Sequence, residues 1–513
     1  MSDGASGASG ASGESSERSD GSARRVVMLV ANGVVGDSRV QKIAWSMAEA
    51  GWSVTLIGRA KGEQVERFPL RGADVVLVPV PKVVSGYERT RRRRAGDATG
   101  ARRAQYRRAR AELAARDART SGRWRSRAAA SVRGWLDGHQ GVDRVVARLG
   151  TGPVGGSART ASAGALGLLD GRGGWRQFNP WFADLELAMA PVVAGLEPEL
   201  IHAHDFHMVG IGARLATTLS TPERPVRWVY DAHEYLAGID VPGRWDLRRR
   251  LRRRMLVGVE REYIRRADAV LTVSDGIADR LAADHRLAVK PLVVLNAPII
   301  ATKATGRRLR DDVGLDDETP LLLYSGGMAP RRGVATAVDA LVSLTDVDTH
   351  LALIARDEDP DVEVLRRRAE QRGVSARLHV VPYVPVDEVV PYIESATIGL
   401  VPILHHPNHE LSLITKYFEY LHACLPIVTS DVREMAETTR RLGVGEVFVA
   451  GDAASLADAV RRVLADLDRY RKVYAGPDDP RGASLWEEQA AKLDRLYRDL
   501  VATPGARAWA RPE

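Results

Sequence analysis

The sequence predicts an α/β protein built from two doubly wound, Rossmann-like domains that face each other across a cleft. Short apolar runs alternate with helical patterns both before and after a polar linker at residues 299–318. Most runs are followed by glycine or polar residues, which is typical of buried parallel strands whose loops hold ligands at one edge of the sheet. With 513 residues, the chain is long enough for two such domains.

The composition favours a soluble, cytoplasmic protein. A single cysteine excludes an internal disulfide, and no charged and then apolar leader opens the chain. No apolar run approaches the roughly 18 residues that a membrane span requires. The net charge of +8 is unevenly distributed, because residues 89–133 hold 16 arginines against three acidic residues.

The first domain is expected at residues 24–298. A Gly/Ser/Ala-rich tail at 1–23 precedes it, and we interpret this tail as disordered because it cannot form a core. A strand at 26–31 leads through a glycine-containing loop into a helix capped by Asp37 or Ser38, and the next strand follows at 53–58. The amides of such a loop can face a ligand, although the dinucleotide-binding pattern GxGxxG is absent.

An Arg-rich insertion interrupts this domain at about residues 83–175. A helix is predicted over 106–119, Trp124 and Trp135 follow it, and residues 149–174 have the composition of a linker. The insertion is a helix on an anionic membrane surface, a nucleic-acid contact through phosphates, or a partly disordered, solvated segment. It resembles no named nucleic-acid module, so we do not expect a nucleic acid as partner. A membrane contact would place the protein at the inner face of the membrane.

Histidines and acidic residues gather at two predicted strand ends. The strand at 200–203 runs into His204 and Asp205, and the strand at 227–230 ends in Asp231-Ala232-His233. Polar groups at the carboxyl ends of parallel strands are where doubly wound sheets hold ligands. Because alternation places His202 and His204 on one face, a metal site is one interpretation.

The second domain is expected at residues 319–482, followed by a terminal helix at 483–503. Its first strand leads into the paired glycines Gly326 and Gly327 and then into Arg332 at the start of a helix. Paired glycines let backbone amides approach a pyrophosphate, and an arginine adds charge and two hydrogen bonds.

A helix within residues 407–426 carries Lys416 and Glu419, three positions apart and therefore on one face. A cation beside a carboxylate suits a ligand that has both phosphates and hydroxyls. The alternative is an amphipathic core helix with an incidental ion pair.

The stretch SLITKYFEYLHACLPIV at 412–428 resembles the nucleotide-sugar signature of GT-B glycosyltransferases of the retaining family 4 type. The loop that ends at Arg332 and Gly333 resembles the family loop G-x-x-x-x-[RK]-G, and the sequence at 202–204 resembles the family's H-x-H segment. The second glutamate of the family's E-x7-E motif matches Glu419. Leu411 stands where the first is expected, one residue after Glu410.

The resemblance implies roles for individual residues of the donor site. Glu419 would hold the ribose hydroxyls of the donor, and Arg332 and Lys416 would stabilise its pyrophosphate. His204 would meet the donor sugar or its phosphate, and Glu410 would replace the missing glutamate on the sugar hydroxyls. The remaining donor-binding candidates are Gly33, Gly326, Gly327 and Ser412.

On the acceptor side the candidates are Arg39 and His233. For Arg39 a solvated helix residue is the alternative, and at the position of His233 the family more often has a structural hydrogen-bonding residue.

The function implied by the resemblance is hexosyl transfer with retention, from a nucleotide diphosphate-sugar to an unidentified acceptor, without a metal or other cofactor. The acceptor would be lipid-linked or a precursor of a polysaccharide or glycoconjugate. Two alternatives remain: a sugar-nucleotide epimerase or phosphorylase of the same fold, and an inactive GT-B relative that acts as a membrane-docked partner. The second alternative follows from Leu411 in the place of a glutamate.

Overall fold

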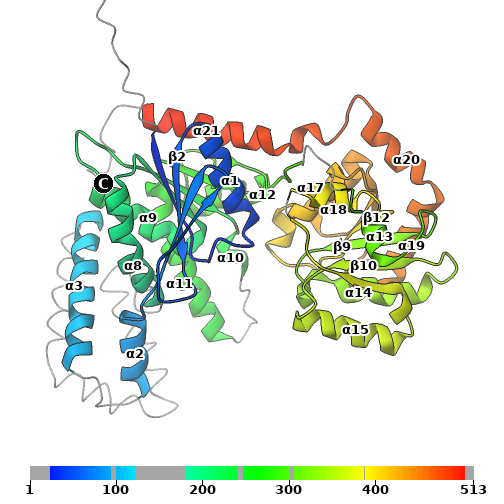
Figure 1. Cartoon of the computed structure of the whole chain (residues 1–513), viewed down its shortest axis with the longest axis horizontal. Coiled ribbons are helices and arrows are strands. Elements are labelled where there is room, and N and C mark those ends of the chain that lie inside the picture. The colour runs from blue at the N-terminus through cyan, green and yellow to red at the C-terminus, as the bar shows by residue number, and fades with distance from the viewer. Residues whose placement is uncertain are drawn as a thin grey trace, which may run out of the picture.

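The computed structural model describes residues 24–93, 100–121, 179–239, 246–300, 306–385 and 387–502. Within these residues the chain forms two α/β domains, each with its own sheet and its own buried cores (Figure 1). The predicted α/β class with two doubly wound domains is confirmed.

The sheet of the first domain has eight described strands in the order β3-β4-β2-β1-β5-β6-β7-β8, and only β3 is antiparallel to its neighbour. The strands are β1 (Arg25–Leu29), β2 (Ser53–Arg59), β3 (Glu66–Leu70), β4 (Ala73–Val78), β5 (Leu200–His204), β6 (Arg227–Ala232), β7 (Ala269–Thr272) and β8 (Leu292–Val293). The edge strand β3 was not predicted, because it contains Pro69. Proline lacks an amide hydrogen and is tolerated in sheets mainly at an edge.

Helices cover both faces of this sheet, and their buried sides read as apolar stripes in the sequence. They are α1 (Ser38–Glu49), α2 (Val84–Arg93), α3 (Gly100–Ser121), α8 (Trp181–Leu196), α9 (Asp205–Leu219), α10 (Leu236–Ile239), α11 (Leu247–Tyr263) and α12 (Asp275–His285). The Asp37 carboxylate caps α1 and the Ser274 hydroxyl caps α12, as expected from side chains that accept from free helix amides.

The second sheet has six described strands, all parallel, in the order β11-β10-β9-β12-β13-β14. They are β9 (Leu321–Ser325), β10 (His350–Ile354), β11 (Leu378–Val381), β12 (Ile398–Val401), β13 (Ile427–Ser430) and β14 (Gly445–Phe448). The accompanying helices are α13 (Leu309–Val313), α14 (Val334–Ala340), α15 (Pro360–Arg372), α16 (Val389–Ile393), α17 (Thr415–His422), α18 (Arg433–Leu442), α19 (Ala453–Ala465) and α20 (Leu467–Lys472).

The last helix, α21 (Trp486–Ala502), runs from the second domain back to the first (Figure 1). The Trp486 indole donates to the Ser46 hydroxyl at 2.8 Å, and the Trp52 indole donates to Asp494 at 2.7 Å. Tyr497 is fully buried in the core of the first domain. The helix therefore belongs structurally to the first domain, although it follows the second domain in the sequence.

The described part of the Arg-rich insertion packs against the first domain. Tyr106 of α3 is buried and stacks on Tyr87 of α2, with 4.2 Å between the ring centroids. Arg116 of α3 lies 2.5 Å from Glu112 and 3.6 Å from the buried Glu186 of α8. One side of α3 is therefore fixed on the protein rather than solvated. Trp124, Trp135 and the expected linker at 149–174 lie outside the described residues.

Several contacts join the two domains. The Ser274 hydroxyl donates to the carbonyl of Leu411 at 2.6 Å, and a Cβ at Gly276 would lie only 2.6 Å from the same oxygen. The close approach therefore requires glycine at position 276. A third link joins Asn296, at the end of the first domain, to Thr415 of α17 at 2.7 Å.

Candidate active site

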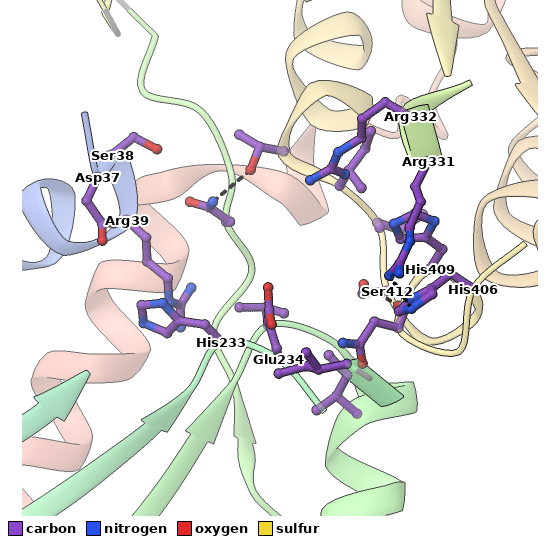
Figure 2. A pocket seen from close by; sticks show the side chains of 18 of the residues that line it. Asp37, Ser38, Arg39, His233, Glu234, Arg331, Arg332, His406, His409 and Ser412 are labelled. Carbon is purple, nitrogen blue, oxygen red and sulfur yellow. Dashed lines mark hydrogen bonds between the residues drawn. The ribbon is translucent and has the colours of Figure 1, made fainter. Parts of the chain in front are cut away.

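A cavity of about 670 Å³ lies between the two domains and is lined by residues from both (Figure 2). The first domain contributes the loop before α1, the end of β6 and the start of α12, and the second contributes the loops after β9 and β12. Both groups follow the carboxyl ends of parallel strands, where ligands bind in doubly wound folds. Residues that line it from the first domain include Asn32, Val35, Asp37, His233, Glu234 and Asn296; those from the second include Arg331, Arg332, His406, His409, Ser412 and Thr415.

The loop before α1 is held in a tight conformation. The side chain of Asn32 donates to Asp37 at 2.7 Å and accepts from the amide of Val34 at 2.8 Å. Val34 has a φ of +66°, a strained conformation for a β-branched residue. A Cβ at Gly58 would lie 2.8 Å from the Asn32 carbonyl, so a glycine in β2 makes room for the loop. Gly33 lies in this loop but does not line the cavity.

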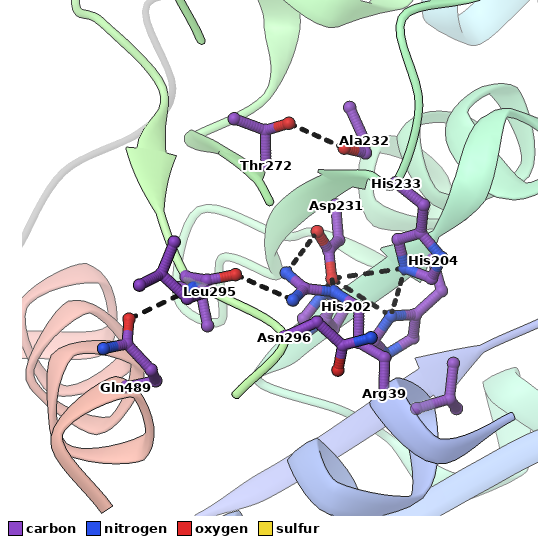
Figure 3. Close-up of polar contacts among 12 residues, drawn as sticks. Arg39, His202, His204, Asp231, Ala232, His233, Thr272, Leu295, Asn296 and Gln489 are labelled. Atoms are coloured by element: carbon purple, nitrogen blue, oxygen red, sulfur yellow. Dashed lines mark hydrogen bonds and ion pairs between the residues drawn. The ribbon is translucent and has the colours of Figure 1, made fainter. Parts of the chain in front are cut away.

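Below this loop, a buried polar cluster surrounds Asp231 at the end of β6 (Figure 3). The guanidinium of Arg39 donates to both carboxylate oxygens of Asp231 at 2.9 Å and to the carbonyl of Val294 at 2.8 Å. Arg39 is 4% exposed, so the alternative of a solvated helix residue is wrong. Its guanidinium joins α1, β6 and the segment after β8.

Three histidines complete the cluster around one oxygen of Asp231. Ring nitrogens of His202, His204 and His233 lie 3.6, 3.4 and 3.3 Å from this oxygen. The rings of His202 and His204 stack with 3.9 Å between centroids, and the hydroxyl of Tyr497 contacts the other side of His202. His202 and His204 are fully buried, whereas His233 is 19% exposed and lines the cavity.

The protonation states in this cluster follow from burial and from the Arg39 charge. Burial opposes ionisation of Asp231, but Arg39 and His233 outweigh it and hold the pKa of the carboxyl well below its usual range. Burial, followed by the neighbouring His202, lowers the pKa of His204 well below 6.5. Burial also disfavours charge on His233, but Asp231 outweighs it and raises the pKa of this imidazole. His233 is therefore the titratable member of the cluster that faces the cavity.

The arrangement of His202, His204 and Asp231 also bears on the metal interpretation. Within the described residues, these three are the group whose donor atoms lie close enough to hold an ion, all within 4.8 Å of one another. Both oxygens of Asp231, however, already accept from Arg39. A metal would have to enter beside a buried guanidinium, which already supplies the positive charge that the carboxylate needs.

The opposite wall of the cavity carries arginines on a loop that only glycine permits. The loop after β9 passes through Pro330–Arg332 and turns at Gly333, where φ is +69°. A Cβ at Gly333 would lie 1.8 Å from the carbonyl of Pro402. The loop therefore packs directly on the chain after β12, and the amide of Leu404 donates to the carbonyl of Arg331 at 3.0 Å.

These arginines have no carboxylate partner within the described residues. Arg331 donates to a ring nitrogen of His406 at 2.9 Å, and no carboxylate oxygen lies within 4.0 Å of Arg332. Both side chains line the cavity and are drawn at one wall of it in Figure 2. An unpaired guanidinium in a cleft is suited to bind phosphate through two parallel hydrogen bonds.

Four further predicted donor residues do not line the cavity: Lys416, Glu419, Gly326 and Gly327. Lys416 lies 3.0 Å from both carboxylate oxygens of Glu419, which confirms their placement on one face of α17. A Cβ at Gly326 would lie 3.8 Å from the Lys416 side chain, so the glycine loop adjoins this pair. An added Cβ at Gly327 would meet no atom within 4 Å. The space beside Gly327 is therefore open.

The carboxylate of Glu410 contacts His405 and the start of α18. One oxygen of its carboxylate lies 2.7 Å from His405, and the other accepts from the amide of Arg433 at 2.9 Å. Glu410 thus stabilises the first turn of α18, and it does not line the cavity. The neighbouring Ser412 does line it.

Two residues that the sequence analysis did not single out connect the walls. Asn296 donates to Thr415 of α17 and accepts from the ammonium of Lys42 of α1 at 2.8 Å. Lys42 is 1% exposed, and its ammonium lies 4.5 Å from the ring centroid of Trp486. Burial, followed by the nearby Arg39, lowers its pKa to about 7. The sequence does contain a signal for the burial of Lys42, because it lies among the apolar residues Val40, Ile43 and Met47 of α1.

The structure thus divides the predicted site residues into two groups. Arg332, Ser412, Arg39 and His233 line the cavity, and Lys416, Glu419, Gly326 and Gly327 form a second group beside it. His204 lies beneath His233, and the histidine at the cavity surface is His233, the acceptor-side candidate. Glu234 and Arg331, each next to a predicted residue, also line the cavity and were missed.

Comparison with known proteins agrees with this geometry. Residues 319–466 match the family model of the glycosyl transferases group 1, and residues 155–300 match that of glycosyltransferase family 4. The fold is similar to that of sucrose-phosphate synthase from Thermosynechococcus elongatus, with a TM-score of 0.61 and 15% identity over 93% of this chain and 99% of the other. Both domains thus match glycosyltransferase family models, and the fold is that of the GT-B glycosyltransferases.

Two further similar proteins have different names. The chain is 24% identical to the 2-deoxystreptamine glucosyltransferase of Streptomyces kanamyceticus, over 42% of this chain and 56% of that protein. It resembles the Anabaena protein HepE in complex with UDP and glucose, with a TM-score of 0.57 and 12% identity over 93% and 99% of the two chains. The chain spans about half the length of the curated relatives that it matches. Within the described residues, no helix is both long and apolar enough to cross a membrane.

Proposed function

We propose that this protein transfers a sugar from a nucleotide diphosphate-sugar to an acceptor in the cavity between the domains. The observation that carries the proposal is the second-domain wall. Arg332 on this wall has no carboxylate partner among the described residues, and the Lys416–Glu419 pair and the glycine loop form a group beside the cavity. Both family models are those of glycosyltransferases, and the HepE structure holds UDP and glucose in a similar fold.

The donor would bind mainly to the second domain. Arg332 and Lys416 would take the pyrophosphate, and their positive charge would stabilise the leaving diphosphate as negative charge develops on it. The amides of Gly326 and Gly327 would add hydrogen bonds. Glu419 would accept from the two ribose hydroxyls, while its bond to Lys416 would fix the orientation of both side chains.

The acceptor would approach from the first domain. His233 and Glu234 are the titratable side chains that this wall presents beside the loop at 32–38. We infer retention from the resemblance to the retaining family 4 type, in which the departing phosphate would help to deprotonate the acceptor on the same face of the sugar. The transfer would need no metal or cofactor, and the acceptor would be lipid-linked or a glycoconjugate precursor.

Binding of nucleotides by calorimetry tests the donor site. We expect one of UDP, GDP and ADP to bind well, and Glu419→Ala to weaken this nucleotide by about 10- to 100-fold, the worth of a charge-assisted hydrogen-bond pair. Glu437→Ala removes an exposed glutamate of α18 and is the matched control, expected to have no effect.

A double-mutant cycle identifies the atoms involved. If Glu419 holds the ribose, the 2′,3′-dideoxy form of the nucleotide binds the wild type weakly and loses nothing further in Glu419→Ala. Full additivity of the two losses would refute the ribose assignment. Failure of all three nucleotides to bind would instead favour the inactive relative, and product formation without an acceptor would favour an epimerase or phosphorylase.

A further inference from the structure

A second cavity, of about 750 Å³, lies on the first domain. It is lined by residues of α10, α11 and α12 and shares no residue with the cavity between the domains. Four of its nine lining residues are arginines: Arg250, Arg253, Arg254 and Arg261; the others are Tyr235, Ala237, Val257, Gly258 and Asp284. We call it the arginine pocket.

The helical repeat explains why α11 presents these side chains together. Positions 250, 254, 257, 258 and 261 are spaced by three and four residues, which places them on one face of a helix. Between the arginines, Gly258 leaves the helix surface bare, since an added Cβ there would meet no atom within 4 Å. This face of α11 therefore leaves open space at Gly258 between the guanidinium groups.

The charges in the arginine pocket are not balanced by the protein. Among the described residues, no carboxylate lies within 4.0 Å of any of the four guanidinium groups. The single acidic residue of the lining, Asp284, accepts from the hydroxyl of Tyr235 at 2.5 Å. Like charges three and four residues apart on a helix repel each other, so the bare pocket destabilises α11 by a small amount.

Three buried or nearly buried arginines of the same domain are each paired with a carboxylate. Arg39 contacts Asp231, Arg214 contacts Glu186 at 2.5 Å, and Arg227 contacts Asp268 at 3.3 Å. Each of these lies at most 11% exposed and has its carboxylate within the domain. Arg250, Arg254 and Arg261 of the pocket are instead exposed, so their guanidinium groups are accessible to a ligand from solution.

We propose that the arginine pocket binds a ligand with phosphate groups, and that it is a site separate from the donor site. Guanidinium groups pair with phosphate oxygens through parallel hydrogen bonds, and four of them around one cavity suit a diphosphate or two neighbouring phosphates. A soluble phosphorylated compound and a phospholipid headgroup present the same chemistry.

The position of the arginine pocket connects it to the acceptor side. The segment 233–239 separates the two cavities: His233, Glu234 and Ile239 line the cleft, and Tyr235 and Ala237 line the arginine pocket. A phosphorylated ligand bound there would lie directly behind the residues that face the acceptor.

Titration with inorganic pyrophosphate, followed by calorimetry at low ionic strength, tests the pocket. The variant Arg250→Gln/Arg254→Gln removes two lining charges, and Arg249→Gln/Arg252→Gln removes two exposed arginines from α11 that do not line the pocket. We expect pyrophosphate to bind at least tenfold more weakly to the first variant and within twofold of wild type to the second. Equal melting temperatures of the variants would show that α11 remains folded.

Two further arms separate the donor site and the source of the phosphate. Binding that persists in Arg332→Ala and disappears in Arg250→Gln/Arg254→Gln belongs to the arginine pocket, whatever the outcome at the donor site. Sedimentation with phosphatidylcholine vesicles, with and without phosphatidylglycerol, shows whether a lipid headgroup supplies the phosphate. Loss of vesicle binding in the pocket variant alone supports the site. Equal behaviour of the two double variants in both assays would overturn it.

Discussion

The two walls of the cleft use the same kinds of side chain in opposite ways. In the first domain, the cation Arg39 is buried and donates to both oxygens of Asp231, and three histidines crowd around this carboxylate. In the second domain, Arg331 and Arg332 face the cavity without a carboxylate partner among the described residues. A charge that is neutralised inside the protein holds elements together, whereas a charge left open to a cavity is available to a ligand. The comparison predicts that changes in the first wall affect stability and changes in the second affect activity.

The largest effect is expected for Asp231→Asn. This change leaves the buried Arg39 without its counter-charge, and breaking one partner of a buried ion pair typically lowers the free energy of unfolding by about 3–5 kcal/mol. Urea unfolding followed by circular dichroism measures the change.

The matched control is Glu363→Gln, which breaks the exposed pair with Arg367 on α15. Exposed pairs contribute about 0–1 kcal/mol, so little change is expected. Similar losses in the two variants would mean that the buried cluster is not the scaffold that we infer.

The next largest effect is expected for Arg332→Ala, on activity rather than stability. Removal of one group that stabilises developing charge typically lowers turnover by about 10²–10³-fold. Sugar transfer or donor hydrolysis measures the change, and an unchanged melting temperature is expected because Arg332 makes no ion pair within the described residues. Arg440→Ala removes an exposed arginine of α18 and should leave turnover unchanged. Full activity of Arg332→Ala would refute the proposal that Arg332 binds the pyrophosphate of the donor.

Lys42 sharpens the comparison, because it is a buried cation of the first domain that has no carboxylate within 4.0 Å in the described chain. Its folded-state pKa of about 7 lies below the usual 10.5. Between these values the unfolded chain binds a proton that the folded chain does not, so the free energy of unfolding rises with pH. Below about pH 7 both states are protonated and the rise is absent.

The expected rise due to Lys42 is about 1.5 kcal/mol from pH 7 to pH 8.5. Lys42→Met keeps the length of the apolar stem and should remove this part of the pH dependence. Denaturant unfolding of the two proteins at both pH values measures it. Parallel pH profiles of the wild type and Lys42→Met would show that Lys42 stays charged when folded.

The smallest effect is expected for Glu410→Gln. The amide oxygen of glutamine can still accept from the amide of Arg433, so stability should change by no more than about 0.5 kcal/mol and turnover by less than threefold. A loss of turnover beyond tenfold would instead support the predicted contact of Glu410 with the hydroxyls of the donor sugar.

Local sequence patterns were sufficient to predict most of the fold and the main residues on the second-domain side of the cavity. The strands expected at 200–203 and 227–230 form β5 and β6, which run one and two residues further, because buried parallel strands are continuous apolar runs between polar turns. Lys416 and Glu419 were placed correctly relative to each other because helical spacing alone fixes their contact.

The first wall could not be derived in this way. Arg39 and Asp231 are 192 residues apart, and His202 and Tyr497 are 295 apart, so only the folded chain shows that they meet. The burial of His204 and the exposure of His233 likewise depend on how α1 and α21 cover the end of the sheet. The sequence named these histidines but could not assign which of them faces the cavity.

Helix α21 has a consequence for how the protein is made. Trp486, Leu493 and Tyr497 belong to the same apolar core as β1 and β2, yet they are synthesised more than 400 residues later. Domains generally fold in the order in which the ribosome releases them. Here the first sheet must wait, with part of its apolar surface uncovered, until the whole second domain has emerged. During translation this protein therefore has an exposed surface that chaperones can bind and that premature termination would leave permanently open.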